Sequence, residues 1–168
     1  MIKLITDRSE EHLELLHRLR KKGWSNMSAS EREIWYGEAA KGAYNHTDLN
    51  RVESAVAEIS GIWGLGPTTK TDWTVWDVPT KADMERYLSN VVAILDHGCS
   101  INFGLIFYGL LMPSTMDELT LEGANNIENA LKAVYKLIYP DADEPDKPAV
   151  NDSRLGTFIL GKDRLGGV

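Results

Sequence analysis

The fold of this chain is decided by Asp48-Leu-Asn-Arg-Val-Glu-Ser-Ala-Val-Ala-Glu-Ile59 and by two later segments that share its pattern. The second is Asp83-Met-Glu-Arg-Tyr-Leu-Ser-Asn-Val-Val-Ala-Ile94, and the third is Gly123-Ala-Asn-Asn-Ile-Glu-Asn-Ala-Leu-Lys-Ala-Val134. In each segment apolar residues recur in steps of 3, 4 and 3, which places them on one face of a helix. The residues that coincide are Leu49, Met84 and Ala124; Val52, Tyr87 and Ile127; Val56, Val91 and Leu131; and Ile59, Ile94 and Val134.

Two interpretations of this pattern remain open. Any three amphipathic helices align once their apolar positions are overlaid, so the match can reflect amphipathicity alone. The other interpretation is an internal repeat, which Arg51 and Arg86 favour because they occupy equal positions. A candidate N-cap precedes each segment: Thr47, Thr80 and Thr120. Thr80 and Thr120 each lie two residues further from their segment than Thr47 lies from the first one.

Two more helices are expected ahead of these segments. Thr6, Asp7 and Ser9 are capping candidates for a helix that ends at Lys22-Gly23. Both Ser28 with Glu31 and Ser30 with Glu33 fit a capping box for a second helix to about Lys41. The prediction is a mainly α fold, a small bundle of about five helices with extended, Trp-containing linkers. Its expected core residues are Leu49, Val52, Val56, Ile59, Met84, Leu88, Val91, Leu95, Ile127, Leu131, Val134 and Ile138.

The chain changes character after residue 140. Residues 1–140 are predicted to be the helical domain, and 141–153 an acidic, Pro-containing linker. Residues 154–168 are predicted to be a docking arm, because a short apolar strand without a sheet needs something to pair with. Its apolar interface candidates are Leu155, Phe158, Ile159 and Leu160. The arm is predicted to pair with another subunit, and folding back onto its own domain is the alternative.

Three tryptophans near or within the long linker after the first segment form a second group of interface candidates: Trp63, Trp73 and Trp76. One interpretation is that they staple the linker onto the bundle, because a tryptophan buries a large apolar area. The other interpretation is functional, as interface anchors or as a platform for sugar rings.

Composition narrows the function classes. The chain has 168 residues, of which 43% are hydrophobic and 26% charged, so it can bury a core. Its net charge of -7 lacks the basic character expected of a nucleic-acid binder. The N-terminus shows no apolar signal segment, and the longest apolar stretch, residues 101–112, is too short to span a bilayer. The expectation is a soluble protein, made in the cytoplasm, without membrane insertion.

No catalytic or metal-binding constellation emerges from the sequence. His12 and His17 are five residues apart, whereas two ligands on one helix face need a spacing of three or four. Cys99 has no base and orienting group nearby, and a lone cysteine forms no disulfide within the chain. The expectation is therefore a protein that is not an enzyme and uses no cofactor and no metal.

A family resemblance is carried by Lys22-Gly-Trp-Ser-Asn-Met-Ser-Ala-Ser-Glu31 and by Lys41-Gly-Ala-Tyr-Asn-His-Thr-Asp-Leu-Asn-Arg-Val52. These runs resemble a module of predicted tail and minor structural proteins from phages and prophages of Gram-positive bacteria. The second part of the same module resembles Lys70-Thr-Asp-Trp-Thr74, Val78-Pro-Thr80 and Asp83-Met-Glu-Arg-Tyr87, and its third part resembles Leu119-Thr-Leu-Glu-Gly-Ala-Asn-Asn-Ile-Glu128. The tail Leu155-Gly-Thr-Phe-Ile-Leu-Gly161 is similar to closing segments of other phage virion proteins. Residues 98–113 depart from the pattern.

The resemblance implies a place in the virion tail, in the baseplate, tail tip or fibre attachment, and it carries no catalytic residues. It implies a scaffolding or adaptor role with other tail or baseplate subunits as partners, and a homo-oligomer within a symmetric particle. The alternative is a module of the same particle that binds cell-wall carbohydrate through the three tryptophans.

Overall fold

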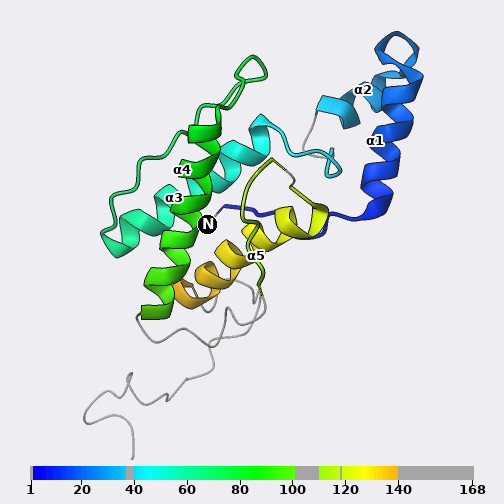
Figure 1. Cartoon of the computed structure of the whole chain (residues 1–168). Coiled ribbons are helices and arrows are strands. Elements are labelled where there is room, and N and C mark those ends of the chain that lie inside the picture. Colours follow the sequence, from blue (N-terminus) through cyan, green and yellow to red (C-terminus); the bar gives the residue numbers. More distant parts are fainter. Residues whose placement is uncertain (1, 37–39, 101–109, 118, 140–168) are drawn as a thin grey trace, which may run out of the picture.

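The computed structural model describes residues 2–36, 40–100, 110–117 and 119–139. Over these residues the chain forms five α-helices and one turn of 3₁₀ helix (Figure 1). In chain order they are α1 Glu10–Lys22, η1 Trp24–Asn26, α2 Ala29–Tyr36, α3 His46–Trp63, α4 Lys81–Gly98 and α5 Leu121–Ile138. The predicted mainly α fold of about five helices is confirmed. The predicted linker 141–153 and arm 154–168 lie outside the described residues.

The last three helices begin at equal positions in their segments. Each has 18 residues, and their N-caps are Asn45, Thr80 and Thr120. Thr80 and Thr120 were predicted as caps, but the prediction of Thr47 was wrong because Thr47 lies in the first turn of α3. Its N–H and hydroxyl donate to the Asn45 side chain (2.8 and 2.7 Å), and the Asp48 carboxylate accepts the Asn45 N–H (2.8 Å). With Asn45 as the cap, the offset of two residues disappears.

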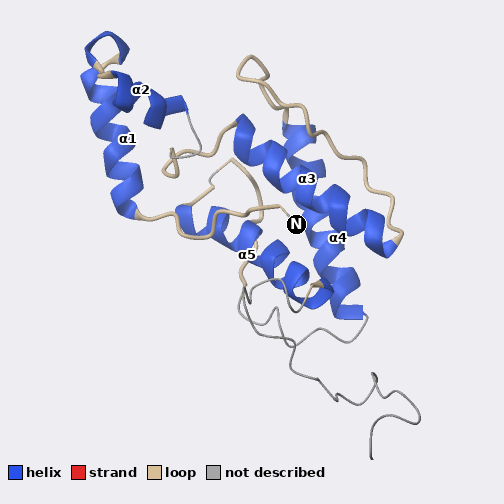
Figure 2. Ribbon diagram, turned by 180° about the vertical axis from the view of Figure 1, so that it is seen from behind, coloured by secondary structure: helices blue, strands red, loops and turns tan. Residues whose placement is uncertain are grey.

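The core lies where α3, α4 and α5 pack against one another (Figure 2). Ten of the twelve predicted core residues are buried there, and the other two, Met84 and Ile138, are partly buried and pack against the same cluster. Tyr87, Ile94 and Tyr135 join them. The periodicity therefore predicted the core correctly, and burying this apolar area is the main stabilising contribution.

α1 and α2 form a hairpin that extends to one side of the core (Figures 1 and 2). Of the three capping candidates Ser9 is the N-cap of α1, which ends before Gly23 as predicted. Of the two predicted capping boxes Ser28 with Glu31 forms at the start of α2, whereas Ser30 lies inside the helix. The predicted extension of the second helix to about Lys41 was wrong at its end, because residue 40 is not helical and 37–39 lie outside the described residues. Gly42 packs against the α1 backbone, and a Cβ there would collide with the His12 carbonyl.

Three extended segments pack against the core formed by α3, α4 and α5. We name residues 2–8, 67–73 and 110–116 straps 1, 2 and 3. Strap 2 is held by α3: the Trp73 N–H donates to Asn50 Oδ1 (2.7 Å), and Asn50 Nδ2 donates to the Trp73 carbonyl (2.8 Å). Three residues earlier, the Lys70 N–H donates to Glu53 Oε2 (2.9 Å). One amide and one carboxylate therefore hold the backbone of the strap.

Strap 1 makes the same contacts with α5. The Arg8 N–H donates to Asn125 Oδ1 (3.0 Å), Asn125 Nδ2 donates to the Arg8 carbonyl (2.9 Å), and the Ile5 N–H donates to Glu128 Oε2 (2.6 Å). Asn125 and Glu128 occupy in α5 the positions that Asn50 and Glu53 occupy in α3. Both straps also contain Thr-Asp between the two contacts, in Ile5–Arg8 and in Lys70–Trp73. Amphipathicity alone does not produce such matching clamps, so the internal repeat is the better interpretation.

Strap 3 differs from straps 1 and 2, and α4 differs from α3 and α5 at the matching position. The Leu111 carbonyl accepts from Asn126 Nδ2 (3.0 Å), as the Thr68 carbonyl accepts from Arg86 (2.9 Å), which sets the alignment of straps 2 and 3. Pro113 then stands where Lys70 donates its N–H, and a proline has none to donate. On α4, Leu88 stands where α3 and α5 carry the accepting glutamate. The donor and the acceptor are therefore missing together.

Candidate functional site

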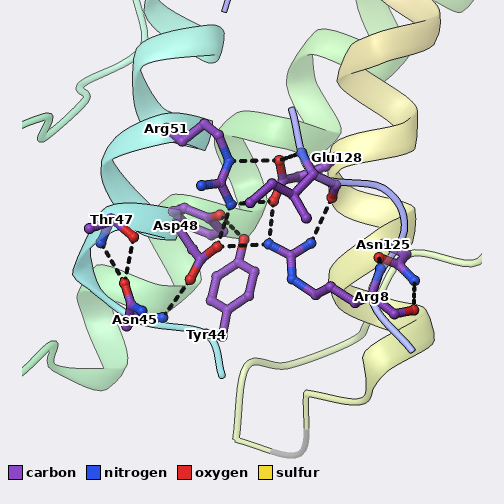
Figure 3. Close-up of polar contacts among 10 residues, drawn as sticks. Arg8, Tyr44, Asn45, Thr47, Asp48, Arg51, Asn125 and Glu128 are labelled. Carbon is purple, nitrogen blue, oxygen red and sulfur yellow. Dashed lines mark hydrogen bonds and ion pairs between the residues drawn. The ribbon is translucent and has the colours of Figure 1, made fainter. Parts of the chain in front are cut away.

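A buried cluster of four charges joins strap 1, α3 and α5 (Figure 3). Arg8 Nη2 donates to Asp48 Oδ1 (2.7 Å) and to Glu128 Oε1 (2.6 Å). Arg51 binds Glu128 with two nitrogens, Nε to Oε2 (2.9 Å) and Nη2 to Oε1 (2.7 Å), and its Nη2 also contacts Asp48. Two cations and two anions balance, and the Glu128 side chain is 0% exposed. We call this cluster the larger clasp, because it holds strap 1 against α5.

The clasp keeps its guanidinium groups charged. Burial by itself lowers the pKa of Arg8 and Arg51, but the carboxylates of Glu128 and Asp48 outweigh it and raise both pKa values. Each carboxylate oxygen accepts at least one hydrogen bond from a strap, a cap or an arginine. All four carboxylate oxygens are therefore hydrogen-bonded, as buried carboxylates require.

A second, smaller clasp holds strap 2. Arg86 of α4 binds Glu53 of α3 through two nitrogens (2.8 and 2.7 Å), and it also donates to the Thr68 carbonyl. The sequence placed Arg51 and Arg86 at equal positions, but their acidic partners were not predicted. The missed signal is a glutamate directly after the apolar residue of a core stripe, at 53 after Val52 and at 128 after Ile127.

Two tyrosines close the core beside the larger clasp. The hydroxyls of Tyr44 and Tyr87 lie 2.5 Å apart, and the Arg8 guanidinium lies 5.3 Å from the centre of the Tyr44 ring. Burial raises the pKa of both hydroxyls, and the nearby carboxylates add to the rise. Both tyrosines therefore resist ionisation in the folded protein.

The structure does not bring the three candidate tryptophans together. Trp73 is buried in the core (4% exposed), so it staples strap 2 to the bundle. Trp63 is half-buried beside His97 at the C-terminal end of α4, with ring centres 5.0 Å apart. Trp76 lies ahead of the N-cap of α4 and is 88% exposed. An 18-residue helix is about 27 Å long, so Trp63 and Trp76 form no common platform.

Trp76 lies on a tight turn that the sequence stabilises. The Asp77 N–H donates to the Thr74 carbonyl (3.1 Å), and Asp77 Oδ2 accepts from the Thr74 N–H (2.6 Å) and hydroxyl (2.9 Å). These bonds keep the pKa of Asp77 below its usual range. Val75 and Val78 flank the tryptophan, and Val78 is 87% exposed. The turn therefore presents three apolar side chains to solvent on an ordered backbone.

The other sequence candidates add no chemistry in the described part of the chain. Leu155, Phe158, Ile159 and Leu160 lie outside it, and Cys99 is exposed. Within the described ranges, no group of three or more His, Cys, Asp or Glu side chains is placed to hold a metal ion. Among the helices that are described, none combines the length and the apolar character needed to cross a membrane.

The comparisons with known proteins add no relative: neither a protein-family model, nor a curated protein, nor a solved structure matches this chain. Over the described residues the architecture itself defines the class of protein, a helical module of three strap-and-helix repeats with a helical hairpin inserted after strap 1.

Proposed function

We propose that this protein is a non-enzymatic structural adaptor of a phage tail or tail-like particle, at the baseplate, tail tip or fibre attachment, where it forms homo-oligomers and binds other tail subunits. One support is the resemblance of its sequence runs to tail modules. The other is the architecture, in which buried charged groups hold straps to helices. A module held together by such contacts suits a scaffold that needs a rigid shape.

The observation that carries the proposal is the exposed turn of Val75, Trp76 and Val78. Isolated apolar side chains are common on protein surfaces, but three neighbours on an ordered turn are typical of an interface anchor. Tryptophan at the centre of such a patch is enriched among residues that dominate binding energy. The turn is braced by Asp77, so little conformational entropy is lost when a partner covers it.

The test combines genetics with one substitution. We expect the genes beside this one to encode sheath, tape-measure or fibre proteins, and a purified product of one of them to bind the full-length chain. Trp76→Ala is expected to weaken that binding by at least about tenfold, since anchors of this kind contribute more than 2 kcal/mol. Trp24→Ala, which removes a tryptophan from the distant hairpin, is the matched control.

Equal binding by both variants would overturn the role of the turn. Binding of cell-wall fragments that Trp76→Ala abolishes, without binding to any tail protein, would instead favour the carbohydrate-binding alternative. Trp73 is buried, and Trp63 and Trp76 lie near opposite ends of α4, which makes that alternative the weaker of the two. Hydrolysis of those fragments by the purified chain would contradict the non-enzymatic assignment.

A further inference from the structure

An open groove lies between α4 and strap 3. It has a volume of about 550 Å³, and its floor is apolar: Met84, Leu88, Val92, Pro113 and Met116. Val92 lies in its lining and is 39% exposed. At straps 1 and 2, an asparagine clamp and a glutamate paired with arginine hold the strap backbone to the helix. In this groove Leu88 stands in place of the accepting glutamate, and Pro113 stands in place of the residue that donates its N–H. The groove can therefore accept an apolar segment.

We propose that residues 154–166 of the same chain bind in this groove as a fourth strap. Leu155, Phe158, Ile159 and Leu160 would supply the apolar side chains, and straps 1 and 2 show that extended segments of this chain are what its helix grooves bind. Glycines at 156 and 161 permit the close approach that a narrow groove requires.

Charge favours the same occupant. The rim of the groove carries Lys81 and three acidic residues, Glu85, Asp96 and Asp117, and is therefore net negative. Residues 154–166 carry three cations and one acid: Arg154, Lys162, Arg164 and Asp163. A net-positive apolar segment is an unusual feature in a chain whose net charge is -7. The two partners are complementary in charge as well as in polarity.

The connection is long enough within one chain. The 14 residues between Tyr139 and Arg154 can extend over about 50 Å, whereas α4 is about 27 Å long. The C-terminal ends of α4 and α5 lie close together (Figures 1 and 2), and straps 1 and 2 run antiparallel to the helices that clamp them. A segment arriving from α5 therefore enters the groove in the direction that the other straps use. A tether of this length gives a millimolar effective concentration, which favours the chain's own segment over a second copy.

Disulfide trapping tests the assignment in the full-length chain. In a Cys99→Ser background, Val92→Cys combined with Phe158→Cys is expected to form an intramolecular disulfide at low protein concentration. The rate should exceed that of a matched control, Val78→Cys with Phe158→Cys, by at least about tenfold, because the tethered partner is concentrated at the groove only. Val78 is exposed and lies outside the groove, so both variants keep the core intact.

A covalent dimer as the main product would overturn the proposal in favour of a second copy as occupant. Equal rates in both variants would overturn it altogether. Asp96→Lys with Asp117→Lys should slow trapping several-fold, and Arg154→Glu with Lys162→Glu should restore it; no response to either change would contradict the charge argument. The assignment concerns the isolated chain, so it stands or fails independently of the proposed tail function.

Discussion

Removing one charge from the larger clasp is the most direct test of how the fold is held. Glu128→Gln keeps the size of the side chain but removes the negative charge that Arg8 and Arg51 share. The Glu128 carboxylate accepts from both guanidinium groups and from the Ile5 N–H, and it is fully buried. The substitution leaves two buried cations with only Asp48 to balance them.

The magnitude follows from the burial. Losing one partner of a buried ion pair costs about 3–5 kcal/mol, because the remaining charge is left without compensation. A domain of this size has a free energy of unfolding of about 5–15 kcal/mol, so the loss is a large fraction of it. We expect strap 1 to detach first, since Glu128 holds both its backbone at Ile5 and the Arg8 side chain.

The assay is urea unfolding followed by circular dichroism at neutral pH. Glu31→Gln is the control, because the Lys22–Glu31 pair lies in solvent and should contribute far less. Adding Arg8→Met to Glu128→Gln should recover part of the lost stability, since it removes one of the uncompensated cations. If Glu128→Gln lowered the free energy of unfolding by less than about 1 kcal/mol, the clasp would not be the element that closes the fold.

Three further predictions concern the core, the hairpin and alkaline pH. Leu131→Ala, at a fully buried position, should lower the free energy of unfolding by about 2–5 kcal/mol in the same urea assay, and a loss below 1 kcal/mol would contradict the shared core. Gly42→Ala should lower the melting temperature, because its Cβ would collide with the His12 carbonyl, whereas Gly61→Ala, where a Cβ meets nothing, should not. Tyr44 and Tyr87 have folded-state pKa values above their ordinary value of 10.0, so the stability they contribute is fully present below pH 10.0 and is lost as the pH rises above it. Absorbance at 295 nm should show these tyrosines ionising only together with unfolding, and Tyr44→Phe with Tyr87→Phe should flatten the alkaline loss; ionisation of all tyrosines near pH 10.0 without unfolding would refute this.

Local information in the sequence was sufficient for the helices and their core faces. Steps of three and four residues mark the buried face wherever a helix forms, and this property depends only on helix geometry. The starts of α1 and α2 follow from capping chemistry between residues three apart, at Ser9 and at Ser28 with Glu31. The Thr47 cap was wrong because α3 begins two residues earlier: the Asn45 side chain accepts the Thr47 N–H, and Asp48 accepts the Asn45 N–H.

The clasps, by contrast, could not be predicted from the sequence. Glu128 and Arg8 are separated by 120 residues, and Glu53 and Arg86 by 33, so no local pattern pairs them. A glutamate next to the buried face of a helix is usually exposed to solvent. Only the packing of α3, α4 and α5 decided that both glutamates face inward and meet arginines.

The same holds for the tryptophans. The sequence placed Trp73 and Trp76 three residues apart in one extended linker, with nothing to distinguish them. In the folded protein the Asn50 amide fixes the backbone at Trp73 and directs that ring into the core, whereas the turn at Thr74 and Asp77 directs Trp76 into solvent. Periodicity, capping and composition by themselves determined that the chain is helical, where its helices lie and which faces they bury. Which side chains meet across the straps was decided by tertiary structure alone, because those contacts join residues that only packing brings together.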